Sequence, residues 1–98
     1  MESLKLEEIR SNMRNLIVVG EIAEIGEARL VETRFGVARV ATAILIDETG
    51  RVKLNLWRDQ INKVKVGNTV RLENAFAREF EGWIELNIGS DGKITVLS

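Results

Sequence analysis

The 98-residue chain contains no cysteine, no histidine and no proline. Without cysteine it can form neither a disulfide framework nor a thiolate nucleophile. Histidine is the commonest metal ligand and the commonest general base near neutral pH, so its absence removes zinc sites and Ser-His or Cys-His nucleophile systems. The lack of proline excludes proline-rich recognition segments. We therefore expect no metal, no cofactor and no catalytic residue, and a protein that is not an enzyme.

The chain also lacks an excess of positive charge, with 14 Lys and Arg against 15 Asp and Glu and a net charge of −1. Many nucleic-acid binders are strongly basic, so such a role here must depend on the local arrangement of charge. Several acids are concentrated in the first third of the chain: Glu2, Glu7, Glu8, Glu21, Glu24 and Glu27. No apolar run is long enough to span a membrane, and no signal peptide is recognisable, which predicts an intracellular protein without a membrane partner.

The length fits a single domain over residues 1–98. Residues 1–12 predict a short N-terminal helix or turn, and residues 58–65 predict one or two helical turns. Alternating and β-branched segments predict strands over 15–34 (broken near Gly26), 37–46, 51–57, 69–80, 83–89 and 93–97. Gly20 predicts a bend in the first strand. The pattern favours an all-β fold, a five- to six-stranded Greek-key OB-fold barrel with a short helix between strands 3 and 4, over an immunoglobulin-type sandwich.

Alternation assigns the two faces of each strand. In 51–57 the core face carries Val52, Leu54 and Leu56, and the outer face carries Arg51, Lys53, Asn55 and Trp57. In 83–89 the inward residues are Ile84, Leu86 and Ile88, and the outward ones are Trp83, Glu85 and Asn87. In 37–46 we expect Val40, Ile44 and Ile46 to point inward and Arg39 and Ala41 to point outward.

The strand 69–80 needs a correction to strict alternation. With Val70 and Leu72 in the core, an unbroken strand would also bury Arg78 between two phenylalanines. A one-residue bulge near Glu73-Asn74 would instead turn the alanines inward and the aromatic residues outward. The unbulged alternative, with Phe76 and Phe80 in the core, stays open at this point.

The outward residues together predict an aromatic and basic surface for nucleic acid: Trp57, Phe76, Phe80, Trp83, Arg39, Arg51, Lys53, Asn55 and Arg78. Aromatic faces stack on unpaired bases, and arginine and lysine neutralise phosphates. Two structural alternatives remain, because Trp57 could cap the barrel end against Ile61 and Trp83 could cover a strand edge. Glu81-Gly82, just before Trp83, predicts a two-residue hairpin turn.

The segments "DETGRVKLNLW", "VGNTVRLENAF" and "EFEGWIELNIGSDGKI" resemble the archaeal single-stranded-DNA-binding proteins of the simple OB type and the OB modules of archaeal replication protein A. The human single-domain single-strand-binding proteins are more distantly similar. The resemblance runs from about Asn12 to Leu97, and it implies that Trp57, Phe76 and Phe80 form a base-stacking triad. Trp83 departs from the family pattern. Several relatives carry a further tail, so we expect either a minimal protein or one module of a longer chain.

The resulting hypothesis is sequence-tolerant binding of single-stranded DNA in replication, recombination or repair, by a cytoplasmic, nucleoid-associated protein with other replication or repair proteins as further candidate partners. One alternative is binding of single-stranded RNA or tRNA by the same face, which would need contacts to the 2′-hydroxyl. Another is a protein-interaction OB module of a larger assembly. Asp47, Glu48 and Thr49 could resemble a carboxylate site, but a turn explains them better.

Overall fold

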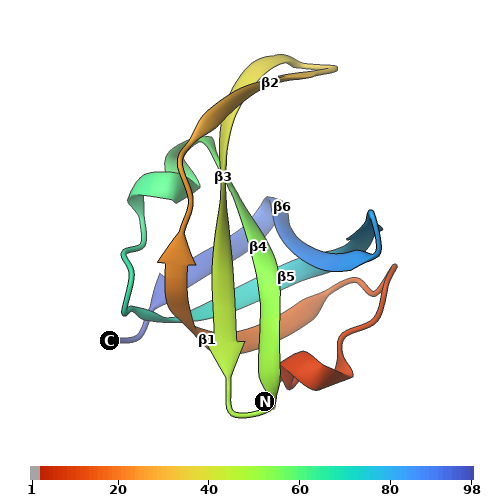
Figure 1. The fold of residues 1–98 in the computed structure, drawn as a ribbon, viewed down its shortest axis with the longest axis vertical. Coiled ribbons are helices and arrows are strands. Elements are labelled where there is room, and N and C mark those ends of the chain that lie inside the picture. The colour runs from red at the N-terminus through yellow and green to blue at the C-terminus, as the bar shows by residue number, and fades with distance from the viewer. Residues whose placement is uncertain (1–2) are drawn as a thin grey trace.

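The computed structural model describes residues 3–98, so Met1 and Glu2, which belong to the expected N-terminal segment 1–12, lie outside the described residues. Within residues 3–98 there are six strands and two short 3-10 helices (Figure 1). The strands are β1 (Leu16–Ile25), β2 (Arg29–Thr33), β3 (Gly36–Asp47), β4 (Gly50–Trp57), β5 (Thr69–Phe80) and β6 (Trp83–Val96). The helices are η1 (Leu6–Glu8) and η2 (Arg58–Asn62).

Five of the strands close a barrel in the order β1-β5-β6-β4-β3, because β1 also pairs with β3. The remaining strand, β2, extends β3 as a hairpin that projects beyond the barrel (Figure 1). All neighbours are antiparallel except β4 and β6, which are parallel. The all-β barrel expected from the sequence is confirmed, while the helix between the third and fourth barrel strands is only the 3-10 helix η2.

The bend at Gly20 is confirmed, and it is what lets β1 belong to two sides of the barrel. β1 pairs with β5 up to Glu21 and with β3 from Glu21 onward. At the bend a Cβ on Gly20 would lie 2.8 Å from the carbonyl oxygen of Ile46. Only glycine permits so close an approach of two backbones without a shift.

One strand boundary agrees with the sequence expectation and another differs from it. The break expected near Gly26 is confirmed, and it is long enough to make two separate strands, β1 and β2, with residues 26–28 between them. The last two expected strands are one, β6, with residues 89–92 looped out opposite Asn74. A Cβ on Gly92 would lie 2.9 Å from the Glu73 carbonyl oxygen, so this turn signal permits a tight irregularity inside a strand rather than ending it.

The barrel interior is apolar and continuous. Its fully buried members are Val18, Ile22, Ala43, Leu45, Leu54, Leu56, Val70, Leu72, Ala75 and Leu86. Leu6 and Ile9 of the N-terminal segment are buried against this cluster, and Ile61 and Val64 cover it from the side of η2. No helix within residues 3–98 is long and apolar enough to cross a membrane.

The turn between β3 and β4 is built on Asp47. One carboxylate oxygen accepts hydrogen bonds from the Thr49 amide at 2.7 Å, the Thr49 hydroxyl at 2.7 Å and the Gly50 amide at 3.1 Å. The other accepts from the Leu6 amide at 2.9 Å, which ties the N-terminal segment to the barrel. Partial burial raises the pKa of Asp47, but these hydrogen bonds outweigh burial and leave that pKa below its usual value. The carboxylate therefore has a structural role here.

Candidate nucleic-acid interface

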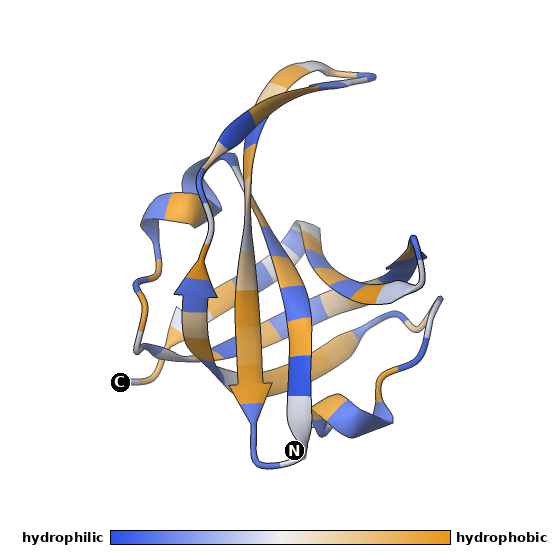
Figure 2. Ribbon diagram, in the orientation of Figure 1, coloured by the Kyte–Doolittle hydropathy of each residue, from blue (hydrophilic) through white to orange (hydrophobic). Residues whose placement is uncertain are grey.

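The outward face of β4 has the composition expected from alternation. Arg51 and Lys53 alternate with buried Val52 and Leu54, and the hydropathy bands along β4 alternate in the same way (Figure 2). Trp57 ends the strand and is half-buried. Because β6 pairs with β4 on one side and β5 on the other, the outward side chains of these three strands share one sheet face.

The bulge expected in β5 is confirmed. The register with β6 shifts between Glu73 and Ala75, and Asn74 adopts a left-handed φ of 55°. Asparagine tolerates this conformation better than most residues. As a result Ala75 and Ala77 fill the barrel interior, with 0% and 2% of their surfaces exposed. The alternative register, with the phenylalanines of β5 in the core, is excluded.

The aromatic residues of β5 consequently lie on the same face as Trp57. Phe76 is half-buried, and Phe80 is 59% exposed. Phe80 pairs directly with Trp83 across the hairpin, and Trp83 is 64% exposed. We call the shared outward face the platform: Arg51, Lys53, Asn55, Trp57, Phe76, Arg78, Phe80, Trp83, Glu85 and Asn87.

Cations lie over two of the platform rings. The Lys53 ammonium is 5.4 Å from the centroid of Trp83, and the Arg78 guanidinium carbon is 5.6 Å from the centroid of Phe76. Such contacts attract a cation to the electron-rich face of a ring. They bring the basic and aromatic residues expected from the sequence into direct contact, and they place Trp83 beside Lys53 rather than at an isolated strand edge.

A hydrogen-bonded network among platform residues was missed by sequence reasoning. The Trp57 indole N–H donates to Asn87 Oδ1 at 3.0 Å, and the Asn55 amide donates to Glu85 Oε1 at 2.9 Å and to Asn87 Oδ1 at 3.4 Å. The Thr42 hydroxyl donates to Asn55 Oδ1 at 3.0 Å. Alternation put Asn87 and Glu85 on the outer face, and that signal could have identified them as platform residues.

The face assignment of β3 was wrong by one residue. Ala43 and Leu45 occupy the core, whereas Ile44 pairs with Lys53 and Ile46 pairs with Arg51 on the platform side. The same register puts Val40 beside Trp57 and Ala41 on the core face. The cause is that the barrel part of β3 is mostly hydrophobic (Figure 2), so its sequence marks its two faces only weakly.

Arg39 is the one expected site residue that the structure does not bring together with the others. It is exposed on the projecting β2–β3 hairpin, where it pairs with Leu30. Alternation from Val40 places it on the opposite face of this ribbon from Trp57. The basic residues grouped on the platform are therefore Arg51, Lys53 and Arg78.

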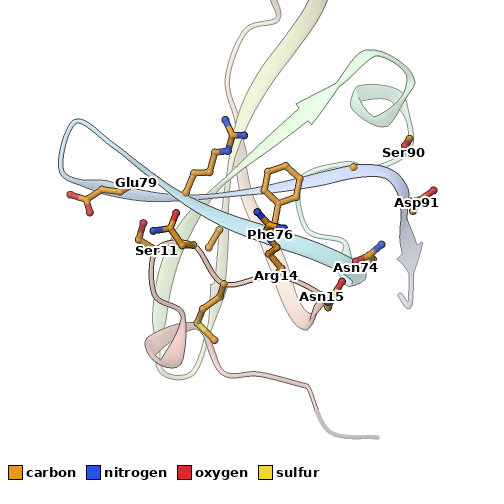
Figure 3. Close-up of a pocket in the computed structure, with 13 residues that line it drawn as sticks. Ser11, Arg14, Asn15, Asn74, Phe76, Glu79, Ser90 and Asp91 are labelled. Atoms are coloured by element: carbon orange, nitrogen blue, oxygen red, sulfur yellow. The ribbon is translucent and has the colours of Figure 1, made fainter.

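Two hollows adjoin the platform. The larger, of about 730 Å³, lies between residues 11–15 of the N-terminal segment, β5 and the looped-out part of β6 (Figure 3). The smaller, of about 360 Å³, lies beside Trp57 and is also lined by Arg58 and Lys63. In residues 3–98 no group of three or more Asp, Glu, His or Cys side chains is placed to hold a metal ion.

The barrel with its five-strand closure and platform defines an OB-fold domain. A family model described as single-stranded DNA binding protein Ssb-like, OB fold, matches residues 9–96, and the chain belongs to this family.

Three individual similarities agree with this assignment. Over 94 residues the chain is 40% identical to the single-stranded DNA binding protein Ssb of Saccharolobus solfataricus, covering 96% of this chain and 64% of that protein. It is 32% identical over 98 residues to replication factor A of Methanothermobacter thermautotrophicus, covering 96% of this chain and 12% of that protein. The chain thus spans less than two thirds of either relative. The OB domain of Ta0387 from Thermoplasma acidophilum has a similar fold, with a TM-score of 0.86 at 20% identity over 100% of this chain and 89% of that domain.

Proposed function

We propose that this protein binds single-stranded DNA through the platform, without a catalytic step, in replication, recombination or repair. The observation that carries this proposal is the grouping of Trp57, Phe76, Phe80 and Trp83 with three cations on one sheet face. Each aromatic ring can stack on one unpaired base, which contributes about 1–3 kcal/mol per base without depending on base identity. The two relatives named above, a single-stranded DNA binding protein and a replication factor, support the same ligand.

The arrangement also suits a single strand better than a duplex. The exposed rings at the β5–β6 hairpin present flat faces, and stacking on them requires bases that are not already stacked in pairs. The net charge of −1 means that phosphate attraction must come from the local group of Arg51, Lys53 and Arg78. Association with the nucleoid and with other replication proteins is part of the proposal.

Titration with oligo-dT, followed by tryptophan fluorescence, tests this function. We expect quenching, because Trp57 and Trp83 both belong to the platform. The affinity should fall with salt with a slope of about 0.7 per phosphate contacted. Titration with an RNA oligonucleotide of matched sequence measures whether the site distinguishes deoxyribose from ribose. Unchanged fluorescence and no complex at low salt would refute the proposal.

A further inference from the structure

The larger hollow shares lining residues with the platform, and part of its wall is formed by the N-terminal segment. We call it the N-terminal groove, and it is lined by Asn12, Arg14, Asn15, Asn74, Phe76 and Ser90 among others. One wall is held in place by backbone hydrogen bonds across the edge of β5, from the Asn12 amide to the Ala77 carbonyl and from the Ala77 amide to the Met13 carbonyl, both 2.9 Å. The groove is therefore framed by hydrogen-bonded chain.

Platform residues form part of this groove. Phe76 and Arg78 belong to both, so a strand stacked on Phe76 is already at the groove's edge. A Cβ at Gly89 would lie 3.8 Å from the Phe76 ring, an ordinary van der Waals contact, so this part of β6 lies beside the ring. Gly89 and Ser90 also line the smaller hollow beside Trp57. The two hollows therefore share residues 89–90 of β6, and each includes aromatic residues of the platform in its lining.

Several polar side chains of the groove are exposed and have no hydrogen-bond partner within residues 3–98. The carboxamides of Asn12, Asn15 and Asn74 form no hydrogen bond with any part of residues 3–98, whereas those of Asn55 and Asn87 are bonded to each other. Each carboxamide offers two N–H donors and one acceptor oxygen. The only ion pair in the described residues joins Arg71 and Glu73, so Arg14 and Arg78 have no acidic partner there.

The groove's backbone is also distinctive. Asn12, Asn15 and Asn74 have left-handed φ values of 71°, 56° and 55°, and they are three of the five non-glycine residues with positive φ in residues 3–98. Asparagine is several-fold enriched in this conformation, and at Asn74 the bulge of β5 accounts for it. The volume of about 730 Å³ falls within the range of about 300–1,000 Å³ typical of small-molecule sites and is enough for a nucleotide.

We propose that the N-terminal groove is a nucleotide subsite that carries the bound strand past Phe76, with Arg14 on a phosphate and the asparagine carboxamides toward the base. The inference rests on the proposed function, because the nucleotide belongs to the same strand that stacks on the platform. Glu79 and Asp91 also line the groove and leave it without net charge. A ligand with hydrogen-bonding edges as well as a phosphate therefore suits it better than a free anion.

The test compares two lengths of oligo-dT, about 5 and about 10 nucleotides, within the range of site sizes found for OB folds. Arg14→Gln removes the groove's own cation. Lys65→Gln is the matched control, because this exposed residue lines neither hollow and its loss changes the net charge equally. Both variants and the wild type are titrated at several salt concentrations, and the side-chain amide resonances of the three groove asparagines are followed by NMR.

For the longer oligonucleotide we expect Arg14→Gln to weaken binding about 2- to 5-fold, as for one exposed ion pair, and to lower the salt slope by about 0.7. The shorter one should bind all three proteins alike, and only the longer should shift the asparagine resonances. If Arg14→Gln matches Lys65→Gln on both lengths, the subsite is refuted while platform binding stands. If the wild type binds neither length, the proposed function itself fails.

Discussion

The β3–β4 turn is stabilised by a side chain, whereas the β5–β6 turn is formed by the backbone alone. At the β3–β4 turn, the two carboxylate oxygens of Asp47 accept four hydrogen bonds. At the β5–β6 turn, Glu81 and Gly82 make the reversal with backbone alone, at φ values of 51° and 85°, as in a type I′ hairpin. The flanking Phe80 and Trp83 remain exposed.

The β3–β4 turn therefore stabilises the fold, whereas the β5–β6 turn exposes aromatic side chains on the surface. Three hydrogen bonds to the Asp47 carboxylate shape the turn and a fourth joins the N-terminal segment to the barrel, so their loss should be felt in folding. Two exposed rings add little to the core, so their loss should be felt in binding. Substitutions in the two turns and in the platform test this separation.

Replacing both Phe80 and Trp83 by alanine should weaken oligo-dT binding by about 2–4 kcal/mol, less than a simple sum because the two rings are neighbours. The free energy of unfolding should change by no more than about 0.5 kcal/mol per exposed site. Anisotropy of a labelled oligonucleotide and urea denaturation measure the two quantities. A double replacement of the exposed Val66 and Leu97 by alanine is the control. Equal loss of affinity in that control would contradict the presenting role of the β5–β6 turn.

Asp47→Asn should lower the free energy of unfolding by about 1–3 kcal/mol, because charge-assisted hydrogen bonds to three amides and a hydroxyl are weakened. The affinity of the folded domain for oligo-dT should not change. Glu48→Gln is the control, since this neighbouring acid is exposed and should alter neither quantity. A variant that unfolds like the wild type but binds DNA weakly would reverse the assignment of the two turns.

Asn87→Ala should weaken oligo-dT binding by about 1 kcal/mol, because the Trp57 indole N–H loses the acceptor that fixes the orientation of its ring. The indole N–H resonance of Trp57, read in a Trp83→Phe background, should move toward that of a solvated indole. Asn62→Ala, at an exposed position of η2, should leave both unchanged. An unaltered Trp57 resonance in Asn87→Ala would show that the hydrogen bond does not orient the ring.

The smallest effect is a dependence on pH. The pKa of Asp47 is lowered in the folded state, so its stabilising contribution is complete above the unfolded value of about 3.9 and is lost as the pH falls through the lower folded value. The stability difference between the wild type and Asp47→Asn should therefore shrink below about pH 4. Urea midpoints at stepwise pH measure this difference, and a difference that stays constant down to pH 3 would contradict the lowered pKa.

Local patterns in the sequence were enough for the β3–β4 and β5–β6 turns and for most of the platform. Strict alternation in β4 assigned Lys53 and Trp57 to the outer face. In β5, the cost of burying Arg78 required a bulge, and the bulge placed Phe76 and Phe80 outside. These inferences worked because each strand carried polar or charged residues that mark one face.

Two kinds of feature depend on tertiary structure: the face assignment of a strand that is apolar on both sides, and contacts between residues far apart in the sequence. The apolar strand β3 has two nearly equivalent faces, and its register was set only by pairing with β4, which put Ile44 opposite Lys53. The contact between Trp57 and Asn87 joins residues 30 apart in the chain. The N-terminal groove brings Arg14 to Phe76 through hydrogen bonds between the backbones of residues 12–13 and Ala77. An OB barrel with an aromatic outer face thus follows from the sequence alone. Which distant side chains share that face depends on closure of the barrel, because alternation reports faces within a strand and not neighbours between strands.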